Sequence, residues 1–195
     1  MTARHKTMTG VLLWAMAAAV SLQGQGAETF TATASVKTEG GAAATAPVTI
    51  VVSRKMPKDE ADKLLASFKT GGITALRSAL GGVKPTGSIK LGKGAATPTR
   101  LTIERTTDKG RLLTIVTDRP ILFLGSGLPG AKPKQGYDFG VADLELDASG
   151  KGTGTLAPAA KISVKQDAFV VEDYGGERID LKDVAVKAAA ATVKK

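Results

Sequence analysis

The chain contains no cysteine, and its only histidine and only tryptophan, His5 and Trp14, both lie within the first 26 residues. Residues 27–195 therefore lack the imidazole that most often acts as a general base near neutral pH and the thiolate that acts as a nucleophile. They also lack the side chains that zinc and copper prefer as ligands. We therefore expect no catalytic residue, no metal site and no cofactor, and the composition favours a protein that is not an enzyme.

The first 26 residues have the three parts of a secretory signal. Arg4 and Lys6 form a basic start, an apolar run (VLLWAMAAAVSL) covers residues 11–22, and Gly24 and Gly26 supply small residues. The run is shorter than the roughly 20 residues of a membrane-spanning helix, although an uncleaved anchor is the alternative. We predict a signal peptide over 1–26, cleavage near Gly26 and a secreted or periplasmic product without a transmembrane segment.

Positive charge predominates. The formal net charge is +9, and the loss of Arg4 and Lys6 with the signal leaves +7. Such a surface is suited to an anionic envelope component. Lys132 and Lys134, in the irregular segment 125–136, are the anion-binding candidates, and an ordinary surface loop is the alternative. Aromatic residues are few and no basic arm is present, so we expect no nucleic-acid partner.

Residues 27–186 have the pattern of one antiparallel domain, followed by a frayed tail at 187–195. In residues 28–37, Phe30, Ala32, Ala34 and Val36 alternate with Thr and Ser, which is typical of a half-buried strand. Short apolar runs separated by polar turns recur from residue 88 onward. We predict a mainly β (α+β) fold of about nine to ten strands, either a barrel or a sandwich. No pattern indicates an oligomeric state.

The period changes at 57–80, where a helical hairpin is expected to cover an end or a face of the sheet. Apolar residues recur at three- and four-residue spacing on both sides of Gly71 and Gly72. If the sheet encloses a cavity, this hairpin is the candidate lid. The ligand-binding candidates are then Leu64, Leu65, Phe68, Leu76 and Leu80. The alternative is that these residues complete a filled core.

The acidic residues are the remaining candidates for chemistry. Asp143, Glu145 and Asp147 alternate with Leu144 and Leu146, so all three carboxylates are expected on one solvent-facing side of a strand. Apolar residues change phase within 137–147, which predicts a β-bulge near Ala142 and Asp143. A second acidic cluster surrounds the Gly175–Gly176 turn, and a polar turn is favoured there over a calcium site. Its members are Glu172, Asp173, Glu177 and Asp180.

Two segments, TIERTTDKGRLLTIVTDRP (102–120) and VVEDYGGERIDLKDV (170–184), resemble an uncharacterised family of exported bacterial β-rich proteins. That family has no assigned activity, so the resemblance implies that the protein is exported but implies no particular reaction. Our leading hypothesis is a non-enzymatic exported domain that binds a small apolar ligand or an envelope component. A structural or assembly protein of the envelope is the second hypothesis, and a carboxylate-dependent hydrolase is the third.

Overall fold

We describe the protein from a computed structural model, which covers residues 26–37, 43–121, 135–165, 168–173 and 178–187. Nine strands and one long helix make up the fold of these residues. They are β1 (Glu28–Lys37), β2 (Ala43–Val52), α1 (Lys58–Gly82), β3 (Gly87–Leu91), β4 (Thr97–Thr107), β5 (Gly110–Thr117), β6 (Phe139–Asp147), β7 (Lys151–Lys165), β8 (Ala168–Asp173) and β9 (Ile179–Lys187). Every strand pairing is antiparallel.

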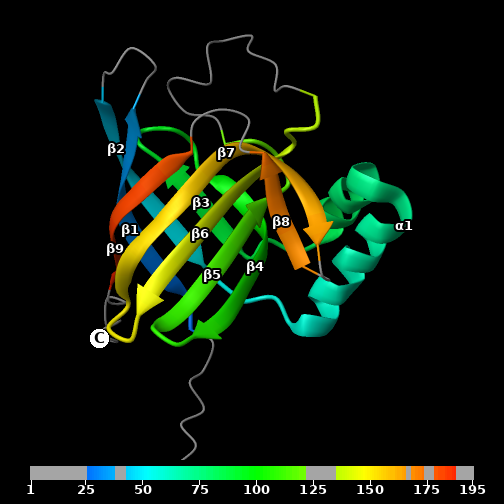
Figure 1. The fold of residues 1–195 in the computed structure, drawn as a ribbon, viewed down its shortest axis with the longest axis horizontal. Coiled ribbons are helices and arrows are strands. Elements are labelled where there is room, and N and C mark those ends of the chain that lie inside the picture. Colours follow the sequence, from blue (N-terminus) through cyan, green and yellow to red (C-terminus); the bar gives the residue numbers. More distant parts are fainter. Residues whose placement is uncertain (1–25, 38–42, 122–134, 166–167, 174–177, 188–195) are drawn as a thin grey trace, which may run out of the picture.

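Eight of the strands close into a barrel (Figure 1). Strands β1 to β6 pair in chain order, β7 pairs with β6, and β9 pairs with both β7 and β1. Strand β8 lies outside this ring, and within the described ranges it pairs only with the second half of β7. The expected mainly β fold with one helical element is thus confirmed, and the barrel is the form that it takes.

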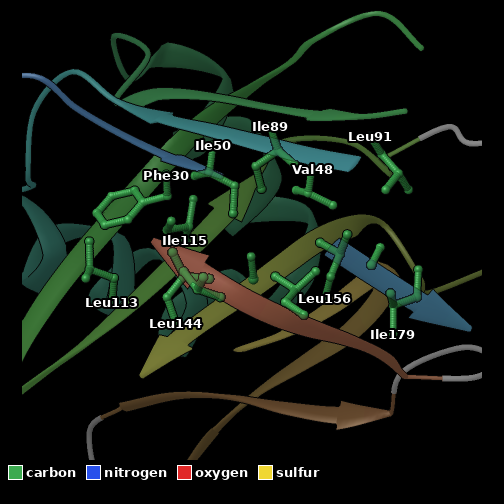
Figure 2. Packing of buried hydrophobic residues seen from close by; sticks show 14 of the residues in the cluster. Phe30, Val48, Ile50, Ile89, Leu91, Leu113, Ile115, Leu144, Leu156 and Ile179 are labelled. Atoms are coloured by element: carbon green, nitrogen blue, oxygen red, sulfur yellow. The ribbon is translucent and has the colours of Figure 1, made fainter. Parts of the chain in front are cut away.

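The barrel interior is filled by aliphatic side chains and Phe30 (Figure 2). Alternation along each strand points every second residue inward, so Phe30 and Ala34 of β1 are both buried as their spacing predicts. Several large inward residues have less than 2% of their surface exposed. Among them are Phe30, Ile50, Ile89, Leu113, Ile115, Leu144, Leu156 and Ile179.

One end of the barrel is closed by ion pairs. The Arg111 guanidinium donates to Glu28 at 2.7 Å and to Glu104 at 2.9 Å, and Lys55 Nζ lies 2.7 Å from Glu104. The guanidinium carbon also lies 5.8 Å from the ring centre of Phe30, so the charged group is placed directly over the apolar interior. Burial raises the pKa of Glu28, but hydrogen bonds and charges from Arg111 and Lys55 outweigh it and hold that pKa below its ordinary value.

Helix α1 covers an outer face of the barrel and not an end. It packs against β4 and β7, and its buried residues Leu64, Leu76 and Leu80 join a second apolar cluster outside the ring. The helix is interrupted at Gly72, whose φ of 62° is a left-handed conformation that glycine adopts without strain. The two expected helical segments, separated by the paired glycines, are therefore present.

The bulge predicted near Ala142 and Asp143 is wrong. Strand β6 pairs with β5 in unbroken register there, with Ile115 opposite Ala142 and Thr114 opposite Asp143. Apolar residues occur in both phases because both faces are buried. Leu144 faces the barrel interior, while Val141 faces the outer cluster beneath α1 and β8. The irregularity that β6 does have lies further back, opposite β7 between Phe139 and Val141.

A candidate ligand groove on the outside of the barrel

A groove with a cavity volume of about 370 Å³ lies between the outer face of the barrel and strand β8. Strand register builds its floor, because Thr114 of β5 and Thr155 of β7 lie directly opposite Asp143 of β6 on the outward side. Strand β8 forms the wall of the groove. It pairs with the second half of β7, and the register of this pairing shifts between Lys161 and Ile162. The volume lies in the range of small-molecule sites.

The groove has an apolar half and a polar half. The apolar half belongs to the outer cluster and is formed by Val116, Val141, Ile162, Phe169 and Val171. The polar half contains Arg105, Thr114, Asp143, Glu145, Thr155 and Arg178. Aliphatic and aromatic walls with a few polar groups are typical of ligand pockets in proteins.

Among the charged residues that line the groove, Asp143 is partly buried and the others are exposed. Thr114 Oγ1 donates a hydrogen bond to its carboxylate at 2.7 Å. No described basic residue forms an ion pair with it. Burial raises the pKa of Asp143 above its ordinary value, and the Thr114 hydrogen bond and the charge of Arg105 only partly oppose this. A desolvated carboxylate in a cleft is a recognised sign of a functional site.

The three carboxylates expected on one solvent face therefore have different surroundings. Glu145 is exposed and lines the same groove as Asp143. Asp147 is exposed beyond it, where its Oδ1 accepts hydrogen bonds from the Ser149 and Lys151 backbone and from the Ser149 hydroxyl. Asp147 thus stabilises the β6–β7 turn, and Asp143 and Glu145 are the two of these carboxylates that line this groove.

The five lid candidates do not surround this groove. Leu64, Leu76 and Leu80 are buried against the barrel wall, and Leu65 and Phe68 are partly exposed. Phe68 is nevertheless linked to the groove, because its ring meets Phe169 of β8 edge-on with centroids 6.2 Å apart. The helix therefore contacts the groove wall at Phe169 and does not cover the barrel opening.

Two other predicted sites are only partly visible. Lys132 and Lys134 lie outside the described residues, so the anion-binding candidates cannot be placed relative to the groove. In the second acidic cluster, Glu172 lies 3.5 Å from Lys161 and Asp173 accepts a hydrogen bond from Tyr137. Asp180 lies 3.7 Å from Arg178. These described carboxylates have protein partners, and Glu177 lies outside the described part.

Sequence reasoning missed the groove itself. The sequence pattern does not show that residues 168–173 form a strand over the outward face of β5 and β6. The sequence does contain one signal: both alternating sets of positions in β6 include apolar residues. A strand with two apolar faces must pack against other elements on both faces.

The fold and the groove together define a closed eight-stranded antiparallel barrel with an apolar interior and an external amphipathic groove. No family model, curated protein or solved structure shows a significant match to this chain. Within the described ranges, no helix has both the length and the apolar character needed to cross a bilayer. Across the same ranges, no three Asp or Glu side chains come together in a metal-binding arrangement.

Proposed function

We propose that this protein is an exported, non-enzymatic binding domain that takes a small ligand with an apolar body in the groove between the barrel and β8. The observation that carries the proposal is the groove's composition, in which a continuous apolar wall faces a partly buried carboxylate. Because the described inward-facing side chains pack into one apolar cluster, we place the ligand in the outer groove rather than inside the barrel.

Dye binding by variants of two matched threonines tests this proposal. Thr155 lies on the groove floor, and Thr153 lies two residues earlier on the same outward face of β7 but outside this groove. We expect the neutral dye Nile red to bind the protein with enhanced fluorescence. Thr155→Trp, which fills the groove, should abolish the signal, and Thr153→Trp should retain it. Absence of dye binding by the unaltered protein, or equal binding by both variants, would refute the groove as a ligand site.

A structural or assembly role in the envelope is the second candidate, and the packed apolar interior and the ion-paired barrel end favour it. Native mass spectrometry of protein purified from its own host separates the two. A co-purified small molecule supports the binding function, whereas a co-purified envelope protein or polymer supports assembly. Hydrolysis by Asp143 and Glu145 is the third candidate, and turnover of a co-purified molecule would indicate it.

The proposal includes secretion or export to the periplasm, in line with the resemblance to exported bacterial β-rich proteins. It is supported by the basic start, the apolar run and the small residues before Ala27. N-terminal sequencing of protein from the periplasm or medium should begin at Ala27. Recovery of the chain from the membrane fraction with Met1 intact would contradict it.

A further inference from the structure

We infer that the ligand of the groove carries a cationic amine, and that Asp143 is its counter-ion. This inference rests on the proposed function, because it names the chemical class of the molecule that the groove takes. The ligand class is thus an amphiphile with an ammonium head and an apolar body.

The first argument is the unused bonding capacity of Asp143. The carboxylate lies in the middle of β6 between Thr114 and Thr155, and among the described residues it receives one side-chain hydrogen bond, from Thr114. An ionised carboxylate has about four acceptor positions, and an ammonium group has three donors. A bound amine would therefore complete the hydrogen bonding of Asp143 and also neutralise its charge.

The second argument is where the charges of the groove lie. Glu145, Arg105 and Arg178 are all exposed at the rim, where water weakens their interactions. Asp143 is the charged residue of the groove that is partly buried, so its field acts through a medium of lower dielectric constant than water. An anionic head group at the same depth would be repelled by the Asp143 carboxylate, whose charge the exposed Arg105 only partly offsets. The deep end of the groove thus selects a cation.

The third argument is the neighbouring apolar surface. Val116 and Val141 lie one outward row beyond Thr114 and Asp143, and Phe169 and Val171 face the groove from β8. A ligand whose head group meets Asp143 therefore lays its body along this wall. The arrangement requires the charge and the apolar chain on the same molecule.

Isothermal titration with three ten-carbon probes tests the inference on the full mature chain at pH 7. The probes are n-decylamine, 1-decanol and decanoate, each below its aggregation concentration. We expect decylamine to bind at least about tenfold more tightly than decanol, as one charged hydrogen bond allows. Decanoate should bind more weakly than decanol.

Asp143→Asn keeps the size of the side chain and an acceptor for Thr114 but removes the charge. This variant should lose the preference for decylamine and retain decanol binding, whereas Asp147→Asn, outside this groove, should behave like the unaltered protein. Amide NMR shifts upon decylamine addition should move at Thr114 and Thr155, which gives a readout independent of any variant.

The outcomes separate this inference from the proposed function. Equal binding of decylamine and decanol, or a preserved amine preference in Asp143→Asn, would overturn the inference while the groove remains a binding site. Failure of all three probes to bind would refute the proposed function as well.

Discussion

The contact between Phe68 of α1 and Phe169 of β8 makes a quantitative prediction about how the groove wall is held. Among the described residues, strand β8 has backbone pairing on one side only, with β7, so its position over the barrel depends on side-chain packing. The two rings meet edge-on at 6.2 Å and 89°. Edge-on pairs of this kind contribute about 0.5–1.5 kcal/mol beyond the area that they bury.

A double-mutant cycle measures that contribution. Truncation of a fully buried Phe to Ala costs about 3–5 kcal/mol, and both rings here are partly exposed, so we expect each single variant to lose about 2 kcal/mol. Phe68→Ala combined with Phe169→Ala should lose about 1 kcal/mol less than the sum of the two, because the shared contact is removed only once. Urea unfolding at 25 °C gives the free energies, provided that the m-value stays constant.

The control pair joins Phe68→Ala with Phe30→Leu. Phe30 lies on the other side of the barrel wall, in the interior cluster, so these two changes should be additive within about 0.5 kcal/mol. Additivity in the Phe68–Phe169 cycle as well would show that helix and β8 are held independently, and the account of the groove wall would be wrong.

Three further predictions concern the barrel and its charges. Gly152→Ala should destabilise by at least about 3 kcal/mol, because a Cβ there would lie 1.8 Å from the Glu145 carbonyl oxygen, whereas Gly81→Ala has open space and should be neutral or stabilising in the same urea assay. The pKa of Glu28 is lowered in the folded protein, so ionised Glu28 stabilises the fold above its ordinary pKa near 4.5, and this stabilisation is lost as the pH falls through the folded-state pKa. Glu28→Gln should therefore reduce the loss of stability in acid, measured as urea midpoints from about pH 6 to pH 3. Asp143 has the opposite sign, since its raised pKa means that stability is lost as pH rises through the folded value, and Asp143→Asn should remove this loss in thermal melts without lowering the melting temperature at neutral pH.

Local patterns of the sequence predict local elements well. The alternation of residues 28–37 matches β1. The helical spacing and the paired glycines predict α1 and its break, because these depend on neighbours along the chain. The prediction left barrel and sandwich open because closure depends on β1 pairing with β9, about 150 residues away.

The candidate site escaped prediction for a related reason. Alternation with Leu144 correctly placed Asp143 on the outward face of β6, and outward was taken to mean solvated. What changes its surroundings is β8, a strand that lies 25 residues further on and is absent from the ring. Whether an outward residue is buried depends on which other elements pack over it. The alternation of residues within a single strand does not predict this.

The position of β8 also bears on why a partly buried carboxylate is kept at this point. The ring closes through β6, β7 and β9 without β8, so barrel formation does not require the groove. Burial without a cationic partner disfavours the charged form of Asp143, and an asparagine would accept the Thr114 hydrogen bond without that disadvantage. Asp143 thus lowers the stability of the fold, and it lies beside β8, which the barrel does not need in order to close. This arrangement is expected of a binding site in which the ligand supplies the cationic partner of the carboxylate.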